Sequence, residues 1–233
     1  IIEGTDAVLK NEYIVLTAHY DHVGVKKNSS PDSIYNGARD DAIGTVALLQ
    51  TANFLSKNPP KRSVILLAVT GEEKGLLGSE WYANHPLIPL NKTVFNLNCD
   101  GAGYNDKTIV SIFDFNRTTV DEWVNKACQA YGLIPKGDPA PEQNLYERSD
   151  NVNFAVKGVP AMNFAPGVKA FDQELFTYYH QPADEVSSLD MDYLQKYYRA
   201  FVYTAYLIAN AAQRPVWKSG DRFADAGKTL YGR

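Results

Sequence analysis

Residues 63–73 read Ser63-Val-Ile-Leu-Leu-Ala-Val-Thr-Gly-Glu-Glu73 and contain the most continuous apolar run of the chain, which ends at two adjacent glutamates. An apolar run of this length is typical of a buried strand in a sheet that helices cover on both faces. A carboxylate beside a buried strand is costly unless it is paired or binds a metal. The stretch therefore predicts an α/β fold with a polar site at the end of this strand.

The same arrangement recurs along the chain. Apolar, strand-like runs over residues 13–18, 94–98 and 176–179 each lead to histidine or acidic residues. In an open α/β sheet, ligands bind outside the carboxyl ends of the strands, and we expect these side chains to gather there. The pattern predicts a metal site. Its five clusters are His19-Tyr20-Asp21, Asp40-Asp41, Glu72-Glu73, Cys99-Asp100 and His180.

Strands and helices are expected to alternate, which is the signature of an α/β sheet between helices. No repeat or linker interrupts this order, so residues 1–233 are predicted to form a single domain. Apolar spacing predicts helices over 42–57, 75–84, 118–131 and 190–213. Strands are expected over 13–19, 63–69, 93–99, 108–113 and 159–164, and a loop over 135–148.

The composition of the 233 residues excludes several classes of function. A net charge of −4 and a pI near 5.6 provide no long-range attraction for nucleic acid or an anionic membrane. No apolar run approaches the roughly 20 residues that span a bilayer. The chain begins at Ile1 without a methionine or a signal-peptide pattern, so we expect an upstream segment to be missing. Cys99 and Cys128 are expected to be free thiols, although a disulfide between them stays open.

The first two clusters each have an interpretation with a metal and one without. His19 can bind a metal, and Asp21, two residues along an extended segment, would face the same way and fix the imidazole tautomer. Both residues could equally be unrelated polar groups at a strand end. Asp40 and Asp41 precede a predicted helix, where acidic residues are routinely caps. Capping and metal binding are compatible if the two aspartates divide these functions.

The later clusters are equally open when each is taken alone. Glu73 can bind a metal while Glu72 acts as general base toward a bound water, or both can belong to an acidic helix start. Asp100 can be a turn residue and His180 a packed loop histidine. Taken together, two histidines and three carboxylates form a nitrogen and oxygen donor set that suits zinc, with cobalt or manganese as substitutes. The remaining histidines, His22 and His85, are interpreted as packed side chains.

Six motifs, in this order and spacing, resemble those of the co-catalytic di-zinc aminopeptidases. That family includes bacterial leucyl aminopeptidase and aminopeptidase Y, and its relatives include glutamate carboxypeptidase, glutaminyl cyclase and the transferrin receptor. The resemblance covers nearly the whole chain. The motifs are Thr17-Ala-His-Tyr-Asp21, Asn36-Gly-Ala-Arg-Asp-Asp-Ala-Ile-Gly44, Thr70-Gly-Glu-Glu73, Asn98-Cys-Asp100, Arg148-Ser-Asp150 with Gly158-Val-Pro-Ala161, and Tyr179-His-Gln-Pro-Ala-Asp184.

The resemblance implies a mixed, largely parallel sheet of about eight strands between helices, with two zinc ions at its carboxyl edge. Asp40, four residues before Gly44, would bridge the two ions. By the same resemblance, His19 and Asp100 would complete one zinc site, and Glu73 and His180 would complete the other. Glu72 would be the general base, and Asp21 would orient His19. Tyr179 would stabilise the tetrahedral intermediate, and Arg148 would contact the substrate backbone.

The implied activity is removal of N-terminal residues from peptides by a secreted or periplasmic enzyme. A glutaminyl cyclase with one zinc and a carboxypeptidase are the alternatives, whereas a receptor-like protein would be expected to lack some ligands. Ile43, Gly101 and Asn151 depart from the residues usual in the family motifs. None of the three is a ligand position, so they bear on the shape of the pocket.

Overall fold

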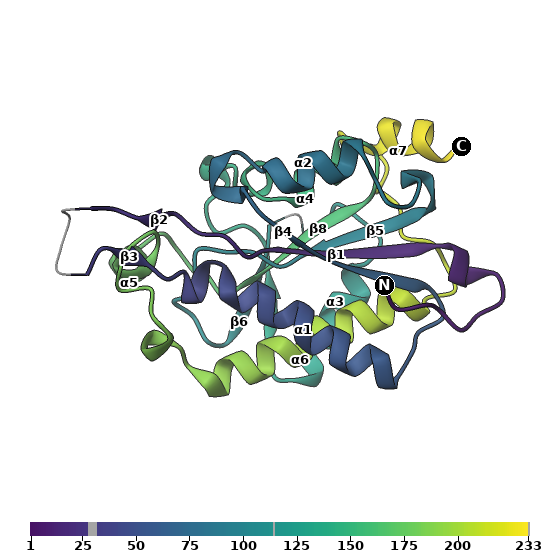
Figure 1. Cartoon of the computed structure of the whole chain (residues 1–233). Helices are drawn as coiled ribbons and strands as arrows, with labels where there is room; N and C mark the ends of the chain where they lie inside the picture. Colours follow the sequence, from purple (N-terminus) through teal and green to yellow (C-terminus); the bar gives the residue numbers. More distant parts are fainter. Residues whose placement is uncertain (28–31, 114, 233) are drawn as a thin grey trace.

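The computed structural model describes residues 1–27, 32–113 and 115–232, and its centre is a six-stranded sheet (Figure 1). Strands β4, β1, β5 and β8 are parallel to one another, whereas β6 is antiparallel to β8 and parallel to β7. The expected mixed, largely parallel sheet is therefore confirmed. In spatial order the strands are β4 (Ser63–Val69), β1 (Tyr13–His19), β5 (Thr93–Asn98), β8 (Ala161–Pro166), β6 (Ile109–Ile112) and β7 (Ile134–Lys136).

The expected number of about eight strands needs a correction for the central sheet. Among the described residues, two further strands, β2 (Gly24–Val25) and β3 (Ile34–Tyr35), pair only with each other as a short antiparallel ribbon. Figure 1 shows this ribbon extending away from the body of the molecule. The central sheet therefore has six strands.

Helices cover both faces of the sheet (Figure 1). One face carries α1 (Ile43–Lys57), α3 (Asp121–Ala130) and α6 (Met191–Asn210), and the other carries α2 (Leu77–Asn84), α4 (Asn151–Ala155) and α7 (Ala224–Tyr231). Strand β1 contributes Ile14 and Leu16 to the core on the first face and Val15 to the core on the second. Burial on both faces explains why the strands are continuously apolar rather than alternating.

The segment before His180 differs from the expectation. Residues Gln173–Tyr178 form helix α5, not a strand, and the Asp172 side chain caps this helix by accepting a hydrogen bond from the Leu175 N–H at 3.1 Å. The apolar run 176–179 was too short to distinguish a strand from a helix by its pattern alone. His180 therefore enters the site from the end of a helix.

The expected loop over 135–148 also needs a correction, because it overlaps β7 and contains the 3-10 helices Pro141–Gln143 and Leu145–Arg148. Helices α4 and α7 were not predicted. Other short helical segments are Leu9–Asn11, Ala38–Ala42, Glu72–Lys74, Leu90–Lys92 and Val186–Ser188. Cys99 and Cys128 are buried free thiols, as expected. Among the described helices, none has the length and apolar character needed to cross a membrane.

Candidate metal centre

Two neighbouring parallel strands deliver the first part of the site. The register of β1 and β5 pairs Thr17 with Asn98, so His19 and Asp100 leave the sheet at the same edge. The Nε2 atom of His19 lies 3.3 Å from Asp100 Oδ1. The His19 residue is fully buried and 8% of the Asp100 residue is exposed, so neither group can rely on water for its polar contacts.

Loops deliver the second part. Glu73 lies in the 3-10 helix Glu72–Lys74 directly after β4, and His180 follows α5 with a positive φ of 54°. The Nε2 atom of His180 lies 3.2 Å from Glu73 Oε1. The His180 side chain is 34% exposed, in contrast to the buried His19.

Asp40 connects the two parts through its two carboxylate oxygens. Its Oδ1 atom lies 3.1 Å from His19 Nε2, and its Oδ2 atom lies 3.1 Å from His180 Nε2. The main-chain N–H of Asp40 donates to Asp184 Oδ2 at 3.2 Å, and the N–H of Arg39 donates to Asp184 Oδ1 at 2.8 Å. The buried Asp184 carboxylate thereby ties the Asp40 segment to the segment that follows His180.

The neighbouring Asp41 has a different environment, and a cis peptide bond joins the two aspartates. Asp41 Oδ1 accepts a hydrogen bond from the N–H of Gly44 at 3.0 Å, in the first turn of α1. A Cβ atom at Gly44 would lie 2.2 Å from the Cys99 carbonyl oxygen, so only glycine fits there. The two aspartates thus divide the tasks of helix capping and site formation, as the compatible interpretation of the sequence required.

His19 contacts Asp21 as expected, but through a different atom of Asp21. His19 Nδ1 lies 3.1 Å from the main-chain carbonyl oxygen of Asp21 and 3.7 Å from the Asp21 carboxylate. A hydrogen bond to a carbonyl oxygen fixes the imidazole tautomer with Nδ1 protonated, which leaves Nε2 free to bind a metal. The main chain of Asp21 makes this contact, whereas the expectation assigned it to the carboxylate.

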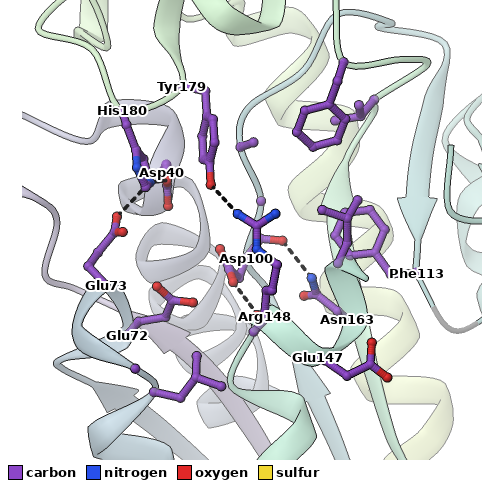
Figure 2. Close-up of a pocket in the computed structure, with 18 residues that line it drawn as sticks. Asp40, Glu72, Glu73, Asp100, Phe113, Glu147, Arg148, Asn163, Tyr179 and His180 are labelled. Carbon is purple, nitrogen blue, oxygen red and sulfur yellow. Dashed lines mark hydrogen bonds and ion pairs between the residues drawn. The ribbon is translucent and has the colours of Figure 1, made fainter. Parts of the chain in front are cut away.

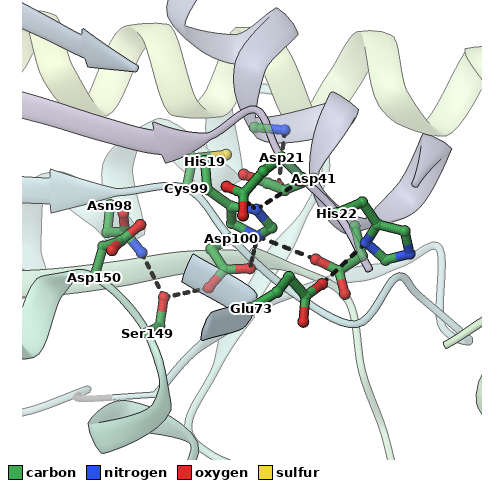
Figure 3. Close-up of polar contacts among 12 residues, drawn as sticks. His19, Asp21, His22, Asp41, Glu73, Asn98, Cys99, Asp100, Ser149 and Asp150 are labelled. Atoms are coloured by element: carbon green, nitrogen blue, oxygen red, sulfur yellow. Dashed lines mark hydrogen bonds and ion pairs between the residues drawn. The ribbon is translucent and has the colours of Figure 1, made fainter. Parts of the chain in front are cut away.

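A buried polar network supports Asp100 from behind (Figure 3). The Ser149 hydroxyl donates to Asp100 Oδ2 and accepts from Asn98 Nδ2 at 2.7 Å. Asn163 Nδ2 donates to the main-chain oxygen of Asp100 at 3.0 Å, and Thr17 donates to Asn98 Oδ1 at 2.6 Å. Hydrogen bonds of this kind orient a carboxylate that binds a metal. Ser149 and Asn98 occur in the sequence motifs, but no function was predicted for them.

A pocket of about 410 Å³ opens beside these groups, and Figure 2 shows the residues that line it. Glu72, Tyr179 and Arg148, all expected to belong to the site, lie in its wall. Arg148 Nη2 donates to the Tyr179 hydroxyl oxygen at 3.1 Å. Phe113 and Phe171 line another part of the same pocket, so the cavity combines polar and apolar walls.

The charged groups of the site strongly shift one another's pKa values. Burial alone would lower the pKa of His19, but hydrogen bonds to Asp100 and Asp40 raise it far above its ordinary value. Burial would likewise lower the pKa of His180, whereas Asp40 and Glu73 raise it to about 10. Burial and then the nearby Asp100 carboxylate raise the pKa of Glu72 to about 9. The concentration of carboxylates therefore favours cations within the cluster.

The donor atoms of the site form two groups that share Asp40. One group is His19, Asp40 and Asp100, and the other is His22, Asp40, Glu73 and His180, with the donor atoms of each group within 4.8 Å of one another. The structure thus brings together all five residues expected to bind metal. It adds His22, which the sequence analysis interpreted as a packed histidine; its position three residues after His19 was the available signal.

Residues 1–205 match the sequence profile of Peptidase family M28. The chain belongs to family M28. Curated relatives include the vacuolar membrane protease of Verticillium alfalfae, 36% identical over 119 residues, which are 49% of this chain and 11% of that protein. The vacuolar membrane protease of Coccidioides posadasii is 28% identical over 181 residues, 77% of this chain and 16% of that protein. The chain therefore spans less than a fifth of these relatives.

Solved structures share the M28 fold. BSAP, a zinc aminopeptidase from Bacillus subtilis, superposes with a TM-score of 0.67 at 24% identity, over 96% of this chain and 51% of that one. The aminopeptidase from Aneurinibacillus sp. strain AM-1 gives a TM-score of 0.68 at 24% identity, over 91% and 48%. At these identities the likeness shows the fold, and it agrees with the expected zinc-exopeptidase architecture.

Proposed function

We propose that this M28 chain is a zinc-dependent aminopeptidase that hydrolyses N-terminal residues from peptides. The observation that carries the proposal is the position of Asp40, whose two oxygens each face a different imidazole at 3.1 Å. One carboxylate between two donor groups is the arrangement of two-metal hydrolases. The single-zinc cyclase has less support, because a second complete donor group would have no purpose in it.

The residues fit two zinc ions. His19, Asp40 and Asp100 would hold one ion, and Asp40, Glu73 and His180 the other. The oxygen Glu73 Oε1 is buried and makes no hydrogen bond within the described part of the chain, which supports a cation as its partner. When bound, zinc supplies a Lewis acid that polarises the scissile carbonyl and lowers the pKa of water. Cobalt or manganese would suit the same donors.

Glu72 is suited to the general base. It lines the pocket next to the donor groups but belongs to neither of them. Its carboxylate would accept the proton of the attacking water and return it to the leaving amine. Cations in the cluster would offset the burial and the Asp100 charge that raise its pKa, and would leave Glu72 ionised near neutral pH.

Tyr179 and Arg148 would act on the substrate. Burial, and next the Asp40 charge, raise the pKa of Tyr179 to about 12, so its hydroxyl keeps the proton that it would donate to the developing oxyanion. The bond from Arg148 at 3.1 Å holds this hydroxyl in the wall of the pocket. These positions support the proposed functions of both residues, with Arg148 contacting the substrate backbone.

The direction of cleavage depends on the terminus that the pocket prefers. Glu72, Glu73 and Asp100 in its wall would attract the α-ammonium group of a free N-terminus, which favours an aminopeptidase. Arg148 in the same wall would attract a C-terminal carboxylate, so a carboxypeptidase is the second candidate. The aminopeptidases of Bacillus subtilis and Aneurinibacillus, which share the fold, support the first candidate.

A zinc count combined with a peptide panel tests the proposal. We expect two zinc ions per chain and hydrolysis of peptides with a free N-terminus, with loss of activity after chelation. N-acetylated peptides should resist cleavage, whereas peptides with a C-terminal amide should be cleaved. Cleavage of the acetylated but not the amidated peptides would establish a carboxypeptidase. One zinc per chain with cyclisation of a Gln-peptide would establish a cyclase.

Three expectations from the sequence stay predictions. They include the secreted or periplasmic location and the single catalytic domain over residues 1–233; the third is the set of functions assigned to the individual site residues. The peptide nature of the substrate is likewise part of the proposal, since the matched region is a small part of the curated relatives.

A further inference from the structure

His22 is a buried polar side chain that the expected ligand set leaves without a purpose. Only 6% of its side chain is exposed. Its Nδ1 atom lies 3.0 Å from Glu73 Oε1, and its ring stands nearly perpendicular to the His180 ring at a centroid distance of 5.4 Å. Figure 3 shows His22 beside Glu73, at the side of the cluster away from Ser149.

The contact between His22 and Glu73 has the length of a hydrogen bond but not its geometry. Within the described residues, neither ring nitrogen of His22 nor Glu73 Oε1 makes a hydrogen bond. Buried polar atoms are nearly always satisfied, so His22 Nδ1 and Glu73 Oε1, which lie 3.0 Å apart, call for an explanation. A cation bound between these two atoms and the neighbouring donors of Asp40 and His180 would satisfy both.

The separations agree with that explanation. Two donors on a tetrahedral zinc ion, each at a bond length of 2.0–2.1 Å, lie about 3.3 Å apart. Around Glu73 and His180 the observed separations are 3.0 Å from His22 to Glu73, 3.2 Å from His180 to Glu73, and 3.1 Å from His180 to Asp40. The four donor atoms all lie within 4.8 Å of one another.

The backbone leaves room for the His22 ring. Gly37 has a φ of 65°, and a Cβ atom there would lie 2.7 Å from His22 Cγ and 2.4 Å from the main-chain oxygen of Asp40. A glycine at this position lets the His22 ring approach the segment that carries Asp40. The ring is therefore held against two elements of the cluster, Glu73 and the Gly37–Asp40 turn.

We propose that His22 is a fourth protein ligand of the metal position formed by Asp40, Glu73 and His180. The inference rests on the proposed metal-dependent function. It makes the two positions unequal, because His19, Asp40 and Asp100 provide only three ligands for the other ion. Zinc sites with four protein ligands are closed and structural, whereas catalytic sites keep an open position. The His22 position would retain its ion tightly, and the open position would bind the reactants next to Glu72.

Substitution by asparagine tests this inference. The Asn side-chain N–H₂ replaces Nδ1–H of a histidine as a hydrogen-bond donor, but an amide nitrogen does not bind zinc. In a competition titration with a chromophoric chelator, both His22→Asn and His22→Ala should lose more than about 100-fold in affinity for one of the two zinc ions, beyond the 10–100-fold typical of residues that only support a ligand. His85→Asn, at an exposed histidine that stacks on Trp81, is the matched control and should titrate as the wild type does.

X-ray absorption of the zinc-loaded wild-type protein tests it without a substitution. We expect three imidazoles for the two ions; two imidazoles would overturn the inference. Wild-type affinity in His22→Asn would also overturn it and would show that His22 contacts Glu73 without binding the metal. Both results leave two zinc ions per wild-type chain, and are thereby distinguished from failure of the proposed two-metal function, in which the wild type binds one zinc ion or none.

Discussion

His19 and Asp100 come from the ends of two hydrogen-bonded parallel strands, whereas His22, Glu73 and His180 come from loops and from the end of a short helix. The register of β1 and β5 fixes the first pair, and the network through Ser149 and Asn98 holds it from behind. We call His19 and Asp100 the strand half of the site and His22, Glu73 and His180 the loop half. In the loop half only Glu73 closely follows a strand of the central sheet, β4, and 34% of the His180 side chain is exposed.

The two halves of the site are held in place by different kinds of contact. The sheet positions the strand ends, and the hydrogen bonds through Ser149 and Asn98 hold Asp100 from behind. Loops have few neighbours to hold them, and additional contacts from His22 and Asp184 compensate for this. Asp40 couples the two halves because each of its oxygens faces one of them.

The largest expected effect separates chemistry from metal binding within the loop half. Glu72→Gln should lower kcat by about 10²–10⁴-fold, because the variant loses the general base, while two zinc ions remain bound. Activity against a free N-terminal peptide and a zinc count on the same sample check both parts. Glu80→Gln, at an exposed glutamate of α2, should leave both quantities unchanged. Full activity in Glu72→Gln would refute the mechanism.

The next effect belongs to the strand half. Ser149→Ala removes the hydroxyl that donates to Asp100. It should lower the affinity for the zinc ion of the strand half by about 10–100-fold and leave the affinity for the ion of the loop half unchanged. Chelator competition that resolves two binding steps is the measurement. Ser56→Ala, at an exposed serine of α1, is the control. Equal weakening of both ions would show that the halves are not independently supported.

A smaller effect is expected where Asp184 ties the two loop segments together. Asp184→Asn replaces one carboxylate oxygen by an N–H₂ group that faces a main-chain N–H, so one buried acceptor is lost. The free energy of unfolding should fall by about 1–3 kcal/mol in urea titrations. Asp192→Asn, at an exposed aspartate of α6, should have no effect of this size. An unchanged midpoint would mean that the Asp40 segment is held by other contacts.

A last effect, confined to the zinc-free protein, concerns a carboxyl group behind the strand half. Burial raises the pKa of Asp150 from 3.8 to about 7 in the folded protein. Between these values the folded state keeps a proton that the unfolded state releases, so this group's contribution to stability falls as the pH rises. In zinc-free protein, the free energy of unfolding of the wild type relative to Asp150→Asn should fall by up to about 1.4 kcal/mol per unit from pH 4 to pH 7. A pH-independent difference would contradict the raised pKa.

Local pattern was sufficient to predict the strand half. The bounds of β1, β4 and β5 agree within one residue with the predicted ones, because strands buried on both faces are predominantly apolar. Parallel strands with their ends at one edge then imply that His19, Glu73 and Asp100 meet. The family motifs added Asp40 and His180, whose separation from the others in sequence carries no geometric information.

Several features of the loop half could not be predicted from the local sequence pattern. Helix α5 was mistaken for a strand, because four apolar residues fit either period. The position of His22 beside Glu73 and the Gly37 turn was not predicted, because it depends on contacts between segments that are far apart in the sequence. The partner of His19 Nδ1 was assigned to the Asp21 side chain, since the sequence does not reveal when a main-chain carbonyl lies closer.

The sequence by itself determined which chemical groups the sheet edge carries, because hydrophobic periodicity specifies strand ends and strand ends in a parallel sheet converge. Only the tertiary structure decided which atoms face one another. Asp40 reaches both halves, Asp41 caps α1, and His22 joins Glu73 through contacts between segments far apart in the chain. Such contacts depend on the packing of loops against the finished sheet, and no local pattern encodes that packing.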